Sequence, residues 1–391
     1  MLISILGGGG RVGLPLGISL ANNGHKVTIV DIDDSRVQKI NNRIMPFSEP
    51  FADEMLLKLS KDQLIATSDY EAIKGTKVCI LIVGTPVDSE GIPSAKYLID
   101  MLIPLKQYLV DVKLLMLRST VYPGITQEIE SYFSTEIPEL LVSFCPERIA
   151  EGKAMEEIRS LPQLVGASSE KAYDLSCEVF KNIAPKTIKL TFSEAEISKL
   201  FANSYRYLKF GIANEFFKIC IENNIDWLKV WQSLREDYPR AKDLPMPGFS
   251  AGPCLVKDTQ QLKYFSTNGF LLGTSALEIN ENLPNFIINF LESKYELKNM
   301  VVGILGMTFK GDVDDFRSSL SFKLKNILEA KSRKVYCSDD LMQKNYFIEM
   351  EELIDLSDLL ILATPHTKYK GLKTNKPLVD IWRISETKSI I

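Results

Sequence analysis

Several residue types that mark common protein classes are scarce in this chain. Its 391 residues include only two histidines, so neither a histidine-centred metal site nor an imidazole-based catalytic triad is expected. The six cysteines form no CxxC pair, which in a chain of this length indicates reduced thiols. No apolar run approaches the length of a membrane span, and the opening MLISILGGGG lacks the features of a signal peptide. We therefore expect a cytoplasmic protein with no metal centre.

An excess of charge of one sign is also absent. Charged residues make up 25% of the chain and the formal net charge is −4. This composition gives no global positive field, so we expect neither nucleic acid nor a membrane as a partner.

The order of sequence patterns predicts the fold. From residue 1 to about 190, runs such as LISILG, KVTIVDID and KVCILIVG alternate with helical stretches, as in a parallel sheet covered on both faces. Residues 191–296 follow helical spacing, beginning with a long helix for which Ser193 and Glu196 fit a capping box. Strand patterns return over 297–391 in MVVGILGMTF, KVYCSDD, LLILATP and PLVDIWRI. The predicted fold class is α/β, with two Rossmann-like doubly wound parallel-sheet domains joined by a helical middle domain. No internal repeat is evident.

A glycine loop follows the first predicted strand. Gly8, Gly10 and Gly13 form a GxGxxG pattern that opens the first helix, where backbone amides can approach a pyrophosphate. Asp31 ends the second strand about twenty residues later, as expected for an acid that accepts hydrogen bonds from the adenosine ribose. Its charge favours NAD over NADP, although Arg36 lies close to it in sequence. A structural turn followed by an acidic loop is the alternative.

A cysteine in MPGFSAGPCLVKDTQQL raises a second question. Cys254 follows a loop of glycines and a proline and opens a predicted helix, whereas Cys79 lies inside an apolar run as a core thiol would. The partial positive charge of a helix N-terminus and the nearby Lys257 would both favour a thiolate. From spacing alone, a reactive thiol and a buried structural thiol remain open. The two histidines, His25 in a turn and His366 after a C-terminal strand, are expected to be solvated and structural respectively, with a nucleotide contact left open for His366.

Motifs along nearly the whole chain resemble those of the nucleotide-sugar 6-dehydrogenases, the family of UDP-glucose, GDP-mannose and UDP-N-acetylhexosamine dehydrogenases. The similar segments are, in order, GGGGRVGLPL, VDIDDSRVQKIN, VGTPV, RSTVYPG, CPERIAEGKA, SEAEISKLFANSYRYLKFGIANE, PGFSAGPCLVKD and GMTFKGDVDDFRSS. The resemblance implies oxidation of a sugar C6 alcohol to a carboxylate with two NAD in succession, through a thiohemiacetal and a thioester on Cys254. It also implies a homodimer or a larger homo-oligomer.

The resemblance assigns expected roles to particular residues. The implied catalytic residues are Thr120, Glu147, Lys199, Asn203, Cys254 and Asp258. The implied cofactor-binding residues are Gly8, Gly10, Arg11, Val12, Gly13, Asp31, Arg36, Gly84, Thr85, Pro86, Ser119, Thr120, Glu151, Lys257 and Arg317. The implied substrate-binding residues are Glu147, Arg148, Glu151, Lys199, Asn203, Arg240, Phe249, Gly252 and Lys310. Lys199 and Asn203 are four residues apart, so both can point at one reacting atom.

The sequence leaves the substrate and two alternative functions open. CPERI and YPR look like the UDP-N-acetylhexosamine branch and CLVKDTQQL like the UDP-glucose branch, whereas the GDP-mannose branch has the least support. The loop before Cys254 carries less glycine than is usual in the family, so it is expected to be stiffer or the sugar pocket tighter. A two-electron NAD dehydrogenase of a hydroxy acid and a non-catalytic nucleotide-sugar binding protein are the alternatives.

Overall fold

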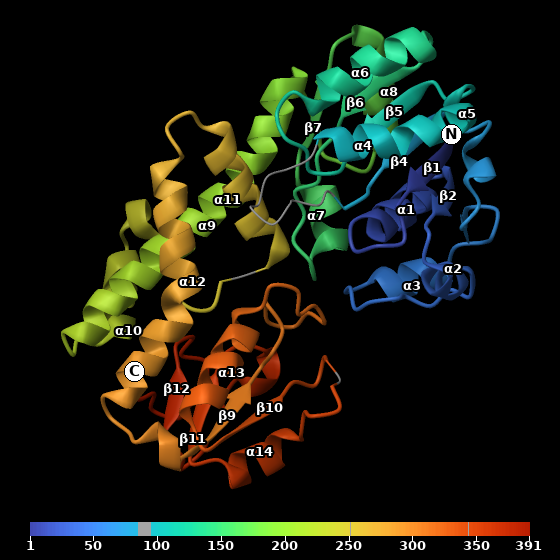
Figure 1. Ribbon diagram of the computed structural model, residues 1–391. Helices are drawn as coiled ribbons and strands as arrows, with labels where there is room; N and C mark the ends of the chain where they lie inside the picture. The colour runs from blue at the N-terminus through green and yellow to red at the C-terminus, as the bar shows by residue number, and fades with distance from the viewer. Residues whose placement is uncertain (85–94, 251, 343) are drawn as a thin grey trace. The chain divides into compact units, whose positions relative to one another are not determined.

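The computed structural model describes residues 1–84, 95–250, 252–342 and 344–391, which form two compact units, Met1–Ala202 and Asn203–Ile391 (Figure 1). The long helix α9 (Phe192–Glu222) begins in the first unit and continues into the second. Over these ranges, no helix combines the length and the apolar character needed to cross a membrane.

The first unit is built on one sheet whose described strands follow the order β3-β2-β1-β4-β5-β6-β7-β8. All neighbouring pairs in it are parallel except β6 and β7, which are antiparallel, a pairing that the expected parallel sheet did not include. The strands are β1 (Leu2–Leu6), β2 (Lys26–Val30), β3 (Leu64–Thr67), β4 (Val78–Leu81), β5 (Leu114–Leu117), β6 (Leu141–Phe144), β7 (Gln163–Ala167) and β8 (Thr187–Leu190). The order reverses between β1 and β4, and ligands of such sheets bind at this switch point.

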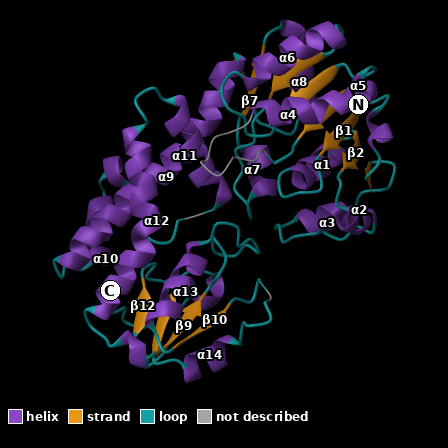
Figure 2. Ribbon diagram, viewed as in Figure 1, coloured by secondary structure: helices purple, strands orange, loops and turns teal. Residues whose placement is uncertain are grey.

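Helices cover both faces of this sheet, as Figure 2 shows. Val78 and Ile80 of β4 point into a core with α1, whereas Cys79 and Leu81 point into a core with α4 and α6. Because both faces are buried, the central strands are continuous apolar runs rather than alternating ones. The helices of the first unit are α1 (Gly13–Asn22), α2 (Asp34–Asn41), α3 (Ala52–Leu57), α4 (Ala95–Leu102), α5 (Lys106–Leu109), α6 (Ile125–Glu136), α7 (Ala154–Ser160) and α8 (Glu170–Phe180).

The second unit combines the helices after α9 with a smaller parallel sheet of order β10-β9-β11-β12. Apolar side chains of α12 pack with those of β9, β11 and α13 in one core. The elements are α10 (Trp227–Arg235), α11 (Pro253–Phe265), α12 (Leu271–Glu292), β9 (Val301–Leu305), α13 (Leu320–Lys331), β10 (Lys334–Ser338), α14 (Met350–Leu356), β11 (Leu359–Leu362) and β12 (Leu378–Asp380). The helices predicted for residues 191–296 and the strands predicted for residues 297–391 are therefore present.

The two sheets share an arrangement that the sequence did not reveal. In each, the first strand lies between the second strand and a later one, β4 in the larger sheet and β11 in the smaller, and an acid follows the second strand. Asp31 accepts a hydrogen bond from Gly9 N, and Asp339 accepts hydrogen bonds from Met307 N and Thr308 N. The acid thus holds the loop that follows the first strand in both sheets.

The start of α9 differs from the predicted capping box. Thr191 and Glu194 form the reciprocal pair, since Thr191 N donates to the Glu194 carboxylate and Glu194 N donates to Thr191 Oγ1. Glu196 is fully buried and accepts hydrogen bonds from Gly124 N and Thr126 N at the start of α6. The Ser193–Glu196 prediction was wrong because Glu196 caps a neighbouring helix rather than its own.

The two histidines are both buried. His366 is 4% exposed, and its ring accepts from Asp312 N and hydrogen bonds to Thr308 and Asp339, so its expected structural role is confirmed. His25 is 9% exposed and its Nδ1 lies 3.3 Å from the Met1 amino group. The expectation of a solvated turn residue was wrong for His25, because the loop before β2 folds back over the start of β1.

Candidate functional site

The glycine loop of the first unit leads from β1 into α1 at the switch point of the sheet. A Cβ at Gly13 would lie 2.5 Å from Gly8 Cα, and one at Gly9 would lie 2.7 Å from the Asp31 carboxylate, so these positions need glycine. A Cβ at Gly10 would meet nothing within 4 Å, so the loop is open there. No side chain caps the N-terminus of α1, which leaves its first amides directed out of the helix. These features fit a dinucleotide pyrophosphate.

Asp31 and Arg36 lie at the end of β2 and on α2. Asp31 is buried, and its two oxygens accept from Gly9 N and Asp33 N at 2.8 and 3.1 Å. A carboxylate has about four acceptor positions, so Asp31 retains capacity for ribose hydroxyls. Arg36 Nε lies 3.2 Å from an Asp33 oxygen, and this pairing offsets the cation that would otherwise favour a 2′-phosphate.

Arg11 and Glu151 connect the glycine loop with the loop 146–152. Arg11 Nε lies 3.9 Å from Glu151 Oε2, and its guanidinium carbon lies 5.1 Å from the centre of the Phe47 ring. One predicted cofactor residue and one predicted substrate-loop residue therefore meet within the first unit.

Three carboxylates hold the backbone of the loop 146–152 and the start of α7. Glu147 Oε1 accepts from the backbone N–H groups of Arg148 and Ile149, and Glu157 accepts from Ala150 N at 2.6 Å. Glu49 accepts from Gly152 N and Ala154 N at 2.9 and 2.7 Å. Burial raises the pKa of Glu49, and these backbone hydrogen bonds oppose that shift. The loop is thereby preorganised by three carboxylates, of which the sequence patterns singled out Glu147 but not Glu49 or Glu157.

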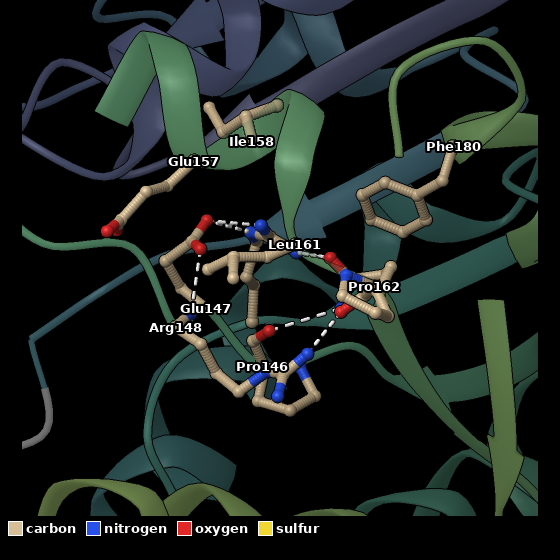
Figure 3. A pocket seen from close by; sticks show the side chains of 10 residues that line it. Pro146, Glu147, Arg148, Glu157, Ile158, Leu161, Pro162 and Phe180 are labelled. Atoms are coloured by element: carbon tan, nitrogen blue, oxygen red, sulfur yellow. Dashed lines mark hydrogen bonds and ion pairs between the residues drawn. The ribbon is translucent and has the colours of Figure 1, made fainter. Parts of the chain in front are cut away.

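Glu147 is also held by a buried arginine at the end of β5. Arg118 Nε donates to Glu147 Oε2 at 3.0 Å, and Nη1 donates to Cys145 O and Gln163 Oε1 at 2.9 Å each. The Arg118 side chain is 2% exposed and lies over the Phe180 ring. Figure 3 shows Glu147, Arg148 and Phe180 around the small pocket at this pair. Arg118 precedes Ser119 and Thr120, and that position in the RST motif was the available signal for its importance.

The remaining predicted residues of the first unit lie at strand ends or on α9. Val83 N donates to Ser119 Oγ at 2.8 Å, which joins the loops after β4 and β5. Thr120 is half-buried, and Gly84 ends the described segment after β4. Thr85 and Pro86 lie outside the described residues. Lys199 is 8% exposed, and within the described ranges it makes no hydrogen bond or ion pair. A buried ammonium of this kind is suited to an anionic partner.

Cys254 is the second residue of α11 and the one exposed cysteine of the six. Burial raises the pKa values of the Cys79 and Cys337 thiols to about 11 and about 12. Burial likewise raises that of Cys145 to about 12, so these thiols are poor nucleophiles. No side chain caps the start of α11. Accessibility and the helix N-terminus therefore both distinguish Cys254.

Asp258 lies one turn after Cys254 and meets a second predicted residue. Asn203 Nδ2 donates to Asp258 Oδ2 at 2.6 Å, and both side chains are buried. Asn203 is on α9 and Asp258 is on α11, so two helices of the second unit bring them together. Lys257, which lies between Cys254 and Asp258 in the sequence, is half-buried.

The loop before Cys254 lies against the smaller sheet's loops. A Cβ at Gly252, where φ is 109°, would lie 2.8 Å from the Phe309 ring. A Cβ at Gly248 would lie 2.3 Å from the Trp382 ring. Phe249 between them is buried. Phe309 and Trp382 were missed from sequence, because an aromatic side chain that packs on a distant glycine leaves no local pattern.

Three further candidates lie on the surface of the second unit or in the loop after β9. The guanidinium of Arg240 is exposed and lies over the Tyr238 ring at 5.3 Å. Arg317 Nε donates to both Asp315 oxygens, and Lys310 is half-buried directly after Phe309. The described chain contains no cluster of His, Cys, Asp or Glu suited to a metal ion.

Comparison with known proteins identifies the same family as the sequence motifs did. Models of the UDP-glucose/GDP-mannose dehydrogenase family match in order, the NAD binding domain over residues 1–184, the central domain over 193–282 and the UDP binding domain over 303–387. The UDP-N-acetyl-D-mannosamine dehydrogenase of Methanococcus vannielii is 30% identical over 382 residues, which cover 93% of this chain and 86% of the relative.

Solved structures agree over nearly the whole length. The UDP-D-ManNAc dehydrogenase of Pyrococcus horikoshii has a TM-score of 0.90 at 26% identity and covers 100% of this chain and 97% of its own. A UDP-glucose dehydrogenase from Pyrobaculum islandicum has a TM-score of 0.89 at 25% identity, covering 98% and 94%. The chain therefore belongs to the UDP-glucose/GDP-mannose dehydrogenase family.

Proposed function

We propose that this protein oxidises the C6 alcohol of a UDP-hexose to the uronate, with Cys254 as the nucleophile that carries the sugar between two oxidations. The observation that carries the proposal is the exposed Cys254 thiol at an uncapped helix N-terminus, one turn before the buried Asp258–Asn203 pair. Membership of the family makes the chain an NAD-dependent oxidoreductase of UDP-sugars.

The proposed reaction consumes one alcohol, two NAD⁺ and one water and yields one carboxylate, two NADH and three protons. The glycine loop and Asp31 would hold NAD, which would supply the hydride acceptor for C6 in each of the two oxidations. Cys254 Sγ adds to the aldehyde carbon formed first, and the resulting thiohemiacetal is oxidised to a thioester. Water then cleaves the C–S bond, which restores the thiol.

The other predicted residues are assigned to individual steps of this proposed reaction. Asp258 takes the proton of the attacking water, and Thr120 helps to hold that water. Lys199 and Asn203 stabilise negative charge on the C6 oxygen, which a buried cation and an amide donor can do. Glu147 is a candidate for assisting thioester hydrolysis, and its pairing with Arg118 keeps the carboxylate in one position.

Binding roles follow the order of the chain. We assign residues 1–190 to NAD, 191–296 to the catalytic helices and 297–391 to the UDP moiety. The residues proposed for NAD are Arg11, Gly13, Asp31, Ser119, Glu151, Lys257 and Arg317. Arg148, Arg240, Phe249, Gly252 and Lys310 are proposed for the substrate.

UDP-N-acetyl-D-mannosamine is the substrate that we propose first. The support comes from the 30% identical UDP-N-acetyl-D-mannosamine dehydrogenase of M. vannielii and from the P. horikoshii structure. A UDP-glucose 6-dehydrogenase of Rickettsia bellii is less similar, at 25% identity. A homodimer and a cytoplasmic location are proposed as well, the former because α9 carries exposed Tyr205, Ile212, Phe216 and Ile219 along one side.

The experiment compares UDP-N-acetylmannosamine, UDP-N-acetylglucosamine, UDP-glucose and GDP-mannose by NADH absorbance. We expect two NADH for each UDP-N-acetylmannosamine consumed, and no turnover with Cys254→Ala. Full turnover in that variant, with one NADH per substrate, would favour a two-electron dehydrogenase. Tight binding of all substrates without NADH would favour a binding protein. Cys177→Ala, a half-buried cysteine that hydrogen bonds to Thr187, is the matched control.

A further inference from the structure

Asn214 of α9 binds the backbone of the loop that leads to Cys254. Its Oδ1 accepts from Gly248 N at 2.8 Å, and its Nδ2 donates to Gly248 O at 3.2 Å. One side chain thus satisfies both backbone groups of one residue, as a neighbouring β-strand would. Asn214 is fully buried, so neither hydrogen bond competes with solvent.

A second buried amide fixes the orientation of the first. Asn280 of α12 accepts from Asn214 Nδ2 at 2.8 Å and donates its own Nδ2 to Tyr207 O at 3.2 Å. Gly248 N can only donate and Tyr207 O can only accept, so each amide has one satisfactory orientation. Asn280 is also fully buried. The pair is therefore a rigid support rather than an adaptable contact.

An aromatic ring also packs against Gly248. Gly248 has φ of 150°, and a Cβ there would lie 2.3 Å from the Trp382 ring. Trp382 is itself held by a hydrogen bond from Nε1 to Ala363 O at 3.1 Å. Gly248 is thereby fixed between Asn214 and Trp382, six residues before the thiol.

Asn214 and Asn203 act on the two sides of Cys254. They are eleven residues apart on α9, about three helical turns, so they lie on the same side of the helix. Asn203 binds Asp258, four residues after Cys254, and Asn214 binds Gly248 before it. One face of α9 therefore binds Gly248 and Asp258, the two residues that flank Cys254 in the sequence.

We propose that Asn214 is a positioning residue for the nucleophile: by fixing Gly248, it keeps the Cys254 thiol in place at the N-terminus of α11, one turn before Asp258. The proposal rests on the proposed role of Cys254. Asn214 touches neither the reacting atoms nor the thiol, so it would act only through the position of the thiol. A displacement of the thiol by about 1 Å can lower the reaction rate about 100-fold.

The test compares Asn214→Ala, Asn280→Ala and Tyr207→Phe in the full-length protein. Tyr207→Phe is the matched control, because it removes a 3.5 Å contact to Glu281 between the same two helices and leaves Gly248 untouched. We expect Asn214→Ala to lower kcat about 10- to 100-fold with the KM for NAD within about 2-fold. We expect a smaller fall for Asn280→Ala and no change for Tyr207→Phe.

A second measurement does not depend on turnover. Iodoacetamide alkylation of Cys254, followed by peptide mass spectrometry as a function of pH, reports the state of the thiol. We expect the profile of folded Asn214→Ala to move to higher pH, because the thiolate loses its fixed place at the helix N-terminus. An unchanged profile together with kcat within 2-fold of wild type would overturn the proposal. The proposal would also be overturned if kcat fell in proportion to the fall in melting temperature in all three variants. If the wild type shows no dehydrogenase activity, the proposed function fails while the alkylation result still decides on the positioning.

Discussion

Asn203 and Asp258 share a 2.6 Å hydrogen bond in which the amide donates to the carboxylate. Both side chains are buried, and they come from α9 and α11. An amide donor of this kind stabilises the ionised carboxylate and fixes its direction, which a general base for water requires. The same bond ties a residue proposed to stabilise the sugar oxygen to one proposed to activate the hydrolytic water.

Asp258→Asn tests this assignment. The substituted amide can still accept from Asn203, so the fold is retained while the base is lost. We expect kcat to fall about 100- to 10,000-fold and the thioester on Cys254 to accumulate, as detected by intact-protein mass spectrometry. Asp243→Asn, at an exposed aspartate paired with Lys209, is the control with unchanged turnover. Normal turnover in Asp258→Asn would remove the aspartate from the proposed mechanism.

Asp31→Ala is expected to weaken NAD binding. Hydrogen bonds to a charged group contribute about 1.5–3 kcal/mol, so the dissociation constant for NADH should rise about 10- to 100-fold by fluorescence titration. The exposed Asp34 in the first turn of α2 provides the control, Asp34→Ala. Equal affinity in the two variants would mean that Asp31 serves only to hold Gly9.

The Arg118–Glu147 pair is expected to be strongly coupled in stability. Removing one partner of a buried ion pair costs about 3–5 kcal/mol because the other charge is left unpaired. We expect Arg118→Met to lower the free energy of unfolding by that amount, and the double variant Arg118→Met/Glu147→Gln to lose less than the sum of the single variants. Urea denaturation measures this. The exposed Lys77–Glu178 pair is the control, at less than about 1 kcal/mol, and additive losses for Arg118 and Glu147 would contradict the coupling.

His25 predicts a pH dependence of stability. Burial, and after it the charge of the N-terminal amino group, lower the pKa of His25 below its ordinary value of about 6.5. The unfolded chain therefore binds a proton at a pH where the folded chain does not. The stability from neutral His25 is present above about pH 6.5 and is lost as the pH falls through the folded-state pKa. Urea denaturation at about pH 7.5 and about pH 5.5 should show this loss in the wild type, and a much smaller one in His25→Gln. The same loss in both proteins would exclude His25 as its origin.

Ile212→Glu tests the proposed dimer. Ile212 is 48% exposed, and Tyr205, Phe216 and Ile219 lie at spacings of seven, four and seven residues from it on α9. A charge in the middle of an apolar interface should convert the dimer to a monomer, measured by light scattering after size exclusion. Lys229→Glu on α10 is the control outside this stripe. A wild type that is already monomeric would contradict the proposal.

Local sequence patterns were sufficient to predict the elements that carry the proposed chemistry. The glycine loop, Asp31 and the position of Cys254 at a helix start all depend on residues close together in the chain, and the structure has them as predicted. The long helix and the second sheet also follow from periodicity. The strands β3 and β6 to β8 were not predicted individually, because none of them lies in a continuous apolar run as long as the one in KVCILIVG.

Contacts between distant segments could not be predicted in this way. Arg118 and Glu147 are 29 residues apart, and the partners of Gly248 lie on α9 and after β12. Glu196 fitted a local capping pattern, yet its carboxylate binds amides about 70 residues earlier. A sequence motif identifies a residue type suited to a role, whereas only the fold decides which of several suited partners it meets.

The acids after β2 and β10 differ in what they can bind. Asp31 accepts two backbone N–H groups, whereas Asp339 accepts three, from Met307, Thr308 and Leu341, and also contacts His366. With about four acceptor positions on a carboxylate, Asp339 has no capacity left for a sugar hydroxyl. In the smaller sheet the acid therefore stabilises the protein's own loops. A nucleotide bound by this sheet would have to be recognised by neighbouring loops instead.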